Sequence, residues 1–146
     1  MLARRHMPTP SGHLMVLREG DDLFAHLEAL MREEEISSAS FTGFGFAGSV
    51  TFGFFDFARG KYDPKTFTRR EIAAMTGTLA WKDGAPSVHA HAAAGDASFA
   101  LVGGHLLALT VGTGSLEITI TRHDAFLQRV RDPAIGANVL QVPPTA

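Results

Sequence analysis

The chain has 146 residues, of which 45% are apolar and 19% charged, and its formal net charge is −2. This length favours one domain with a real hydrophobic core, and the absence of cysteine excludes disulfides, thiolate metal sites and cysteine nucleophiles. The absence of a positive net charge does not favour a protein that binds nucleic-acid backbones. No apolar run suits a signal peptide or a membrane span, so we expect a cytoplasmic protein with no membrane partner.

The N-terminal part is predicted to contain an arm, one strand and one helix. Residues 1–12 are broken by prolines and a glycine and predict an arm, with a single domain over 13–146. HLMVLR (13–18) suits a first strand, and GDDLFAHLEALMREEEI (20–36) is the clearest helix. Its apolar residues recur at helical spacing, and Asp21 or Asp22 can cap its first turn.

The remainder of the chain is predicted to be strands separated by turns. A loop is expected at 58–68 and a short helix at HDAFLQRV (123–130). Strands are expected near 39–46, 49–57, 70–81, 87–94, 98–103, 105–112 and 115–122. One main helix packed against a mainly antiparallel, twisted sheet of about seven strands is an α+β fold.

Three histidines stand out in HAHAAAGDASFALVGGHL, which runs from His89 to Leu106. His89 and His91 lie two apart in a strand and therefore share one face of the sheet. His105 joins that face if a three-residue loop at 95–97 pairs His89 with Gly103, or if a bulge at Gly103-Gly104 turns it. The residues leave both routes open.

Three imidazoles from adjoining strands favour a metal site over packing. They leave a tetrahedral divalent metal with one open position, which is the arrangement of catalytic rather than structural sites. Such a site could bind a small anionic or carbonyl-bearing ligand. The competing interpretation is three hydrogen-bonded polar residues in a pocket or subunit interface. The other histidines lack such company, and no role is assigned to His6, His13, His26 and His123.

Two further patterns are assigned to packing rather than to binding. GFGFAG (43–48) matches a dinucleotide-binding pattern by letter, but a strand-like segment follows it where a helix would be required. The phenylalanines at 52, 54, 55 and 57 are interpreted as core or interface residues rather than as platforms for stacking bases.

Four segments together resemble the plants-and-prokaryotes-conserved (PPC) domain family: REGDDLFAHL, REIAAMTGTL, SVHAHAAAGD and GGHLLALTVGTGSLEITI, in that order over about residues 13–122. The resemblance implies a compact α+β fold assembled as a homotrimer, with a divalent metal, zinc by first choice, on His89, His91 and His105. It also places family acids at Glu71 and Glu117. These could orient imidazoles or anchor a subunit contact, or they could be ordinary glutamates on a solvated strand face.

Members of this family are often described as predicted DNA-binding proteins. Plant members carry an additional Arg-Gly-Arg-Pro segment that enters the minor groove, and this chain has none. The basic pairs at 4–5 and 69–70, with Arg129 and Arg131, could form a patch after trimerisation. Three hypotheses follow: a metal-holding trimer that binds a small ligand, a DNA-binding or transcription-associated module, and a scaffolding trimer whose histidines fill a pocket. No motif indicates a particular substrate or reaction.

Overall fold

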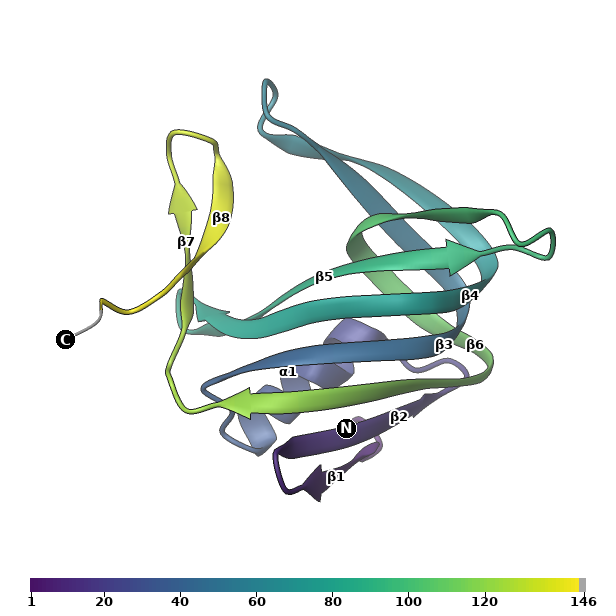
Figure 1. Cartoon of the computed structure of the whole chain (residues 1–146), viewed down its shortest axis with the longest axis horizontal. Coiled ribbons are helices and arrows are strands. Elements are labelled where there is room, and N and C mark those ends of the chain that lie inside the picture. Colours follow the sequence, from purple (N-terminus) through teal and green to yellow (C-terminus); the bar gives the residue numbers. More distant parts are fainter. Residues whose placement is uncertain (145–146) are drawn as a thin grey trace.

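The computed structural model describes residues 1–144 and contains one helix and eight strands within them (Figure 1). The helix α1 spans Leu23–Glu33. The strands are β1 (His6–Thr9), β2 (Gly12–Arg18), β3 (Ser38–Asp56), β4 (Lys61–Lys82), β5 (Ala85–Gly95), β6 (Leu101–His123), β7 (Gln128–Asp132) and β8 (Ala137–Gln141).

The strands form one sheet in the order β1-β2-β6-β3-β4-β7-β8, and β5 pairs with both β4 and β6. The pairing therefore closes on itself through β3, β4, β5 and β6. Every pair is antiparallel except β4 with β7, which meet in parallel at Trp81 and Gln128. The predicted α+β fold, with a mainly antiparallel sheet and one main helix, is confirmed, with eight strands in place of about seven.

The helix α1 lies against one face of the sheet and buries its apolar stripe there (Figure 1). Asp22 is the N-cap, and its side chain accepts a hydrogen bond from the backbone N–H of Ala25 at 2.8 Å, as the sequence allowed. The core between helix and sheet includes the fully buried Leu27, Leu30 and Phe41. The opposite face of the sheet is free of α1, and it carries the three histidines His89, His91 and His105.

The strands are longer than predicted, because glycines bend them without ending the pairing. The two strands expected at 39–46 and 49–57 are one strand, β3, whose register with β6 shifts around Ala47. The prediction of a loop at 58–68 is wrong for residues 61–68, because these residues belong to β4. The three strands expected between 98 and 122 are likewise one strand, β6. GFGFAG lies inside β3 and leads into no helix, as expected.

The C-terminal prediction of a helix at 123–130 is wrong. Residues 128–132 form β7, which turns back through Pro133–Gly136 to pair with β8. The segment before β7 is held beside β4 by a tertiary contact, in which the N–H of Trp81 donates to the carbonyl of Leu127 at 3.0 Å. At the other end, residues 6–9 of the predicted arm form β1 and pair with β2.

Within residues 1–144, the structure contains no helix that is long and apolar enough to cross a membrane.

Candidate metal centre

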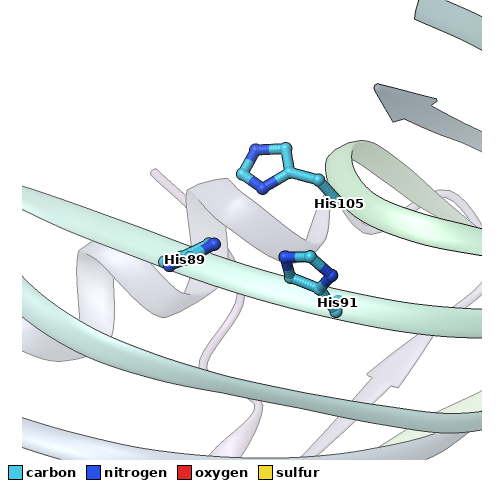
Figure 2. Close-up of side chains that lie close together, drawn as sticks. All are labelled: His89, His91 and His105. Atoms are coloured by element: carbon cyan, nitrogen blue, oxygen red, sulfur yellow. The ribbon is translucent and has the colours of Figure 1, made fainter. Parts of the chain in front are cut away.

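His89 and His91 lie on β5 and point away from the helix. Between and beyond them, Ala90, Ala92 and Ala94 are buried in the core, so the alternation of the strand places both imidazoles on the outer face. This confirms the face predicted from the spacing. Figure 2 shows the two rings on β5 and the ring of His105 reaching toward them from β6.

His105 lies directly across from His91 in the pairing of β5 with β6. Neither predicted route describes this register: the loop has five residues, 96–100, and pairing runs unbroken from His91 to Gly95. Asp96 stabilises the longer loop, because its side chain accepts hydrogen bonds from the backbone N–H groups of Ser98 and Ala100 at 2.9 and 3.1 Å. Lengthening the loop by two residues preserves the face of every side chain, so His105 still meets the other two imidazoles.

The glycine pair before His105 does have a mechanical purpose. A Cβ on Gly103 would lie 2.3 Å from the carbonyl oxygen of Ala92, so only glycine lets β6 approach β5 this closely. Gly104 adopts φ +143°, a conformation that side chains rarely tolerate. These two residues therefore set the separation and the direction of the strand that presents His105.

The three rings are close enough to serve one ion. Their centroids are separated by 5.3 Å (His89 to His91), 5.1 Å (His89 to His105) and 5.4 Å (His91 to His105). One nitrogen from each ring lies within 4.8 Å of those from the other two. Small rotations of the side chains would bring such nitrogens to the roughly 2.0–2.1 Å bonds that zinc makes with imidazole.

The surroundings of His89 and His105 favour their neutral form. Burial is the main cause that lowers the pKa of His105 to about 4, with further contributions from His89 and His91. Burial also lowers the pKa of His89, and the positive charge of Arg129 and the ring of His91 act in the same direction. Neutral imidazole is the form that binds metals, so the donor set fits a divalent cation near neutral pH.

Aromatic side chains form one wall around the cluster. The ring of Tyr62 stacks on His105 with centroids 4.3 Å apart and planes 14° from parallel, and burial raises the pKa of the Tyr62 phenol. A cavity of about 590 Å³ opens here, and all three histidines line it together with Phe52, Phe54, Phe55, Phe57 and Phe67. Of the phenylalanines predicted to be core or interface, Phe52 is buried, whereas Phe54 is 80% exposed.

A buried arginine lies on the other side of the cluster. Arg129, on β7, is only 5% exposed and donates hydrogen bonds to the carbonyl oxygens of Ser87 and Thr78. It lines a second cavity, of about 390 Å³, together with His89 and His105. The sequence analysis placed Arg129 in a basic patch that could form after trimerisation. In β7 Arg129 is buried while its apolar neighbour Val130 is 53% exposed, so the apolar pattern of this segment gives no signal that would have identified Arg129.

Glu71 and Glu117 are exposed and line a cavity of about 420 Å³ beside Phe44, Phe46 and Phe99. Glu117 also lines a cavity of about 660 Å³ together with His91. Within residues 1–144 neither glutamate forms a hydrogen bond or ion pair with an imidazole. The structure therefore gives no support to their orienting the metal-binding rings, and their other proposed place, at a subunit contact, stays a prediction.

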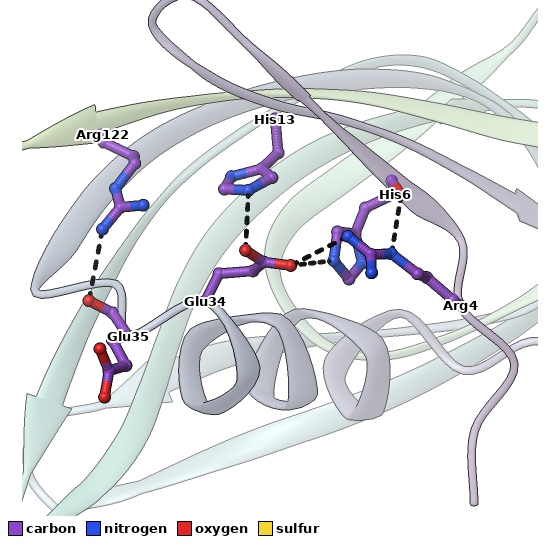
Figure 3. A network of polar contacts seen from close by, with 6 residues as sticks. All are labelled: Arg4, His6, His13, Glu34, Glu35 and Arg122. Carbon is purple, nitrogen blue, oxygen red and sulfur yellow. Dashed lines mark hydrogen bonds and ion pairs between the residues drawn. The ribbon is translucent and has the colours of Figure 1, made fainter.

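The histidines without an assigned role make structural contacts instead. His6 and His13 both approach Glu34 at the end of α1, with Nε2–oxygen distances of 2.9 and 3.7 Å (Figure 3). His26 contacts the carbonyl oxygen of Asp22 through Nδ1 at 2.8 Å. His123 contacts the hydroxyl of Ser40 through Nε2, also at 2.8 Å.

Comparison with solved structures finds the same fold in several organisms. A suspected DNA-binding protein from Ralstonia eutropha JMP134 is 55% identical, covers 95% of this chain and 96% of its own, and superposes with a TM-score of 0.93. A metal-containing protein from Archaeoglobus fulgidus is 23% identical, with a TM-score of 0.81 and coverage of 97% and 100%. A plant- and prokaryote-conserved protein from Pyrococcus horikoshii is 21% identical, with a TM-score of 0.81 and coverage of 99% and 100%.

No curated protein sequence matches the chain. The Plants and Prokaryotes Conserved (PCC) domain, the family introduced above as PPC, matches residues 5–124, which include all three histidines of the cluster and most of the sheet. The chain therefore belongs to the Plants and Prokaryotes Conserved domain family.

Proposed function

We propose that the protein holds a divalent metal ion, zinc by first choice, on His89, His91 and His105, and that it binds a small ligand there. The observation that carries this proposal is the convergence of three ligand nitrogens within 4.8 Å on two adjoining strands. Support also comes from the A. fulgidus relative, which is named as a metal-containing protein. When bound, such an ion supplies a Lewis acid with a free coordination position.

The residues around the cluster suit a small ligand. The aromatic side chains give one cavity an apolar lining, while the residues His89 and His91 remain exposed. The two cavities that His89 and His105 share have volumes of about 590 and 390 Å³, which match the range of small-molecule sites.

Metal analysis of protein prepared without chelators or an affinity tag tests this proposal. We expect about one zinc ion per chain, lost after treatment with a strong chelator and regained when zinc is added. Protein that contains no metal and takes up none from zinc, cobalt or manganese solutions would refute the proposal. The variant His123→Ala, which removes an exposed histidine outside the cluster, is the control and should keep the zinc content of the wild type.

We further propose that the chain assembles as a homotrimer. Exposed apolar side chains gather on the outer sheet face and at the β5–β6 loop, including Phe44 (56%), Phe99 (92%) and Leu101 (63%). Contacts between copies would cover them. Light scattering coupled to size-exclusion chromatography should give three times the mass of the 15.6 kDa chain, and a monomeric mass at micromolar concentration would exclude the trimer. The cytoplasmic location expected from the sequence stays a prediction.

DNA binding is the second candidate function, and the R. eutropha relative favours it, since that protein is 55% identical and is named for a suspected DNA-binding role. The net charge of −2 opposes it. Fluorescence anisotropy with a labelled duplex at about 20 to 300 mM salt separates the two functions, because phosphate contacts make affinity fall steeply with salt. Absence of binding at the lowest salt would eliminate this candidate.

A further inference from the structure

Arg129 is a buried cation whose partners are all neutral. Its guanidinium donates hydrogen bonds to the carbonyl oxygens of Ser87 and Thr78 and to the hydroxyl of Thr78. Within residues 1–144 it forms no ion pair with any carboxylate. Burial lowers the pKa of Arg129, yet a guanidinium remains charged near neutral pH. A buried charge without a counter-charge is costly, so this position favours an anion.

The guanidinium also faces the histidine cluster. Thr78, which accepts from Arg129, lies directly across from His89 in the pairing of β4 with β5. The charge of Arg129 is close enough to act on His89 and lower its pKa. Both residues line the cavity of about 390 Å³, together with His105, Arg131 and Asn138. The cavity thus has cationic and amide groups on one wall and imidazoles on the other.

Two of the cavities beside the cluster, those of about 590 and 390 Å³, have opposite character. The larger is lined by phenylalanines and the smaller by Arg129, Arg131 and Asn138, and His89, His105, Tyr62 and Phe55 belong to both. A ligand at the imidazoles can therefore place an apolar group among the aromatic rings while its charged end reaches the guanidinium. Arginine binds planar or tetrahedral oxyanions through parallel N–H donors.

We propose that Arg129 is the anchor of an oxyanion subsite beside the histidine cluster, and that the ligand of this protein is a small organic acid or phosphate ester with a compact apolar group. The proposal deepens the function proposed above, and its metal-dependent part rests on that function. The subsite itself belongs to this chain's own residues and can be tested with and without metal.

The test is a titration of isotope-labelled protein followed by nuclear magnetic resonance of the arginine Nε–H groups. The probes are 2-methylpropanoate, phosphate and chloride, each added to metal-free and to zinc-loaded protein. We expect the Arg129 resonance to shift with saturable binding of 2-methylpropanoate or phosphate and not of chloride. Tighter binding of the carboxylate identifies organic acids as the ligand class, and tighter binding of phosphate identifies phosphate esters. No saturable shift with either oxyanion would overturn the proposal.

Variants separate an anion anchor from a structural role of Arg129. Because Arg129→Gln lacks the Arg129 resonance, oxyanion binding to the variants is followed by isothermal titration calorimetry. Arg129→Gln should weaken this binding at least about tenfold, whereas Arg32→Gln, an exposed arginine in the last turn of α1, should leave it unchanged. If Arg129→Gln does not fold, Ala137→Leu provides a second variant, because it narrows the same cavity and leaves every hydrogen bond of Arg129 in place. Unchanged oxyanion affinity in a folded Arg129→Gln or in Ala137→Leu would refute the subsite.

The outcome is distinguishable from failure of the metal proposal. Oxyanion binding that depends on Arg129 in a protein that never takes up metal would support the subsite and reject the metal centre. Uptake of zinc with no oxyanion binding in either state would support the metal centre and reject the subsite.

Discussion

Two groups of histidines lie on this sheet, and they differ in what stands among the rings. At the N-terminal end, Glu34 lies between His6 and His13, whose side chains are only 4% and 3% exposed (Figure 3). On the outer face, the rings of His89, His91 and His105 lie with their centroids 5.1–5.4 Å apart, and Tyr62 stacks on His105 (Figure 2).

The difference indicates which group binds something external. Glu34 forms a hydrogen bond with His6 and lies 3.7 Å from His13, and the hydrogen bond from His6 lowers the pKa of Glu34. This carboxylate gives the N-terminal group a partner within the fold and contributes to stability. Imidazoles that meet only one another keep their lone pairs free, and neutral rings repel no cation. The first group therefore serves the fold, while the second suits a metal ion.

The largest expected effect is on metal content. Replacing His89 and His91 together with alanine should reduce zinc from about one ion per chain to background, with little change in the secondary structure seen by circular dichroism. The matched control is His123→Ala, which removes an exposed imidazole from the same sheet. Mass spectrometry of desalted, zinc-treated samples measures the difference, and full zinc content in the double variant would place the metal elsewhere.

A smaller effect is expected from removing the carboxylate of the other group. Glu34→Ala leaves two buried histidines without their acceptor and should lower the free energy of unfolding by about 1–3 kcal/mol. Urea denaturation of the metal-free protein measures this loss. Glu33→Ala, an exposed residue one position earlier on α1, is the control, and an equal effect of both variants would show that the cluster contributes nothing beyond helix propensity.

The pH dependence of the same pair follows from the pKa shifts. The hydrogen bond from His6 lowers the pKa of Glu34 below its usual 4.5, so its ionised form stabilises the folded state above that value, and the contribution is lost as pH falls through the lower, folded pKa. Burial lowers the pKa of His13 from 6.5, so the folded state favours neutral His13 and loses stability as pH falls below 6.5. We expect the advantage of wild type over Glu34→Gln to shrink below pH 4.5. The free energies of unfolding of both proteins are measured by urea denaturation at several pH values. A difference between the two proteins that stays constant down to pH 3 would contradict this expectation.

The smallest effect concerns the hydroxyl of Tyr62. It lies 3.5 Å from Nδ1 of His105, which is long for a hydrogen bond, whereas the ring itself stacks closely on the imidazole. Tyr62→Phe should therefore change zinc affinity by less than about threefold, and Tyr62→Ala should weaken it more. Competition with a chromophoric chelator measures both. A larger effect of Tyr62→Phe than of Tyr62→Ala would mean that the hydroxyl, not the ring, supports His105.

Much of the fold was accessible from local patterns. The apolar spacing of α1 and its cap at Asp22 depend on neighbouring residues, and both were predicted. The lengths of the strands were not, because glycines that look like turns, such as Gly48, lie inside bent strands whose pairing continues. The hairpin of β7 and β8 was missed because its place beside β4 depends on the hydrogen bond between Trp81 and Leu127, which are far apart in the sequence.

The candidate site also combines features that follow from local sequence patterns with features that depend on tertiary structure. That His89 and His91 share a face follows from the period of a strand, and His105 joins them for any odd loop length of this kind. The actual register depends on how Asp96 caps its loop, which spacing alone does not determine. Arg129 reaches the cluster only through tertiary structure, since it is 38 residues beyond His91 and on a strand that sequence patterns assigned to a helix.

The hydrogen bond from Arg129 to Ser87 has one more consequence. The ladder between β5 and β6 covers only 91–95, so the earlier half of β5 has β4 as its single ladder partner. There the guanidinium of Arg129 donates a hydrogen bond to the carbonyl oxygen of Ser87. A charged side chain at the edge of a sheet disfavours the addition of a strand from another chain. Arg129, the proposed ligand anchor, thus also covers an edge of the sheet. Loss of Arg129 would make the protein more prone to aggregate.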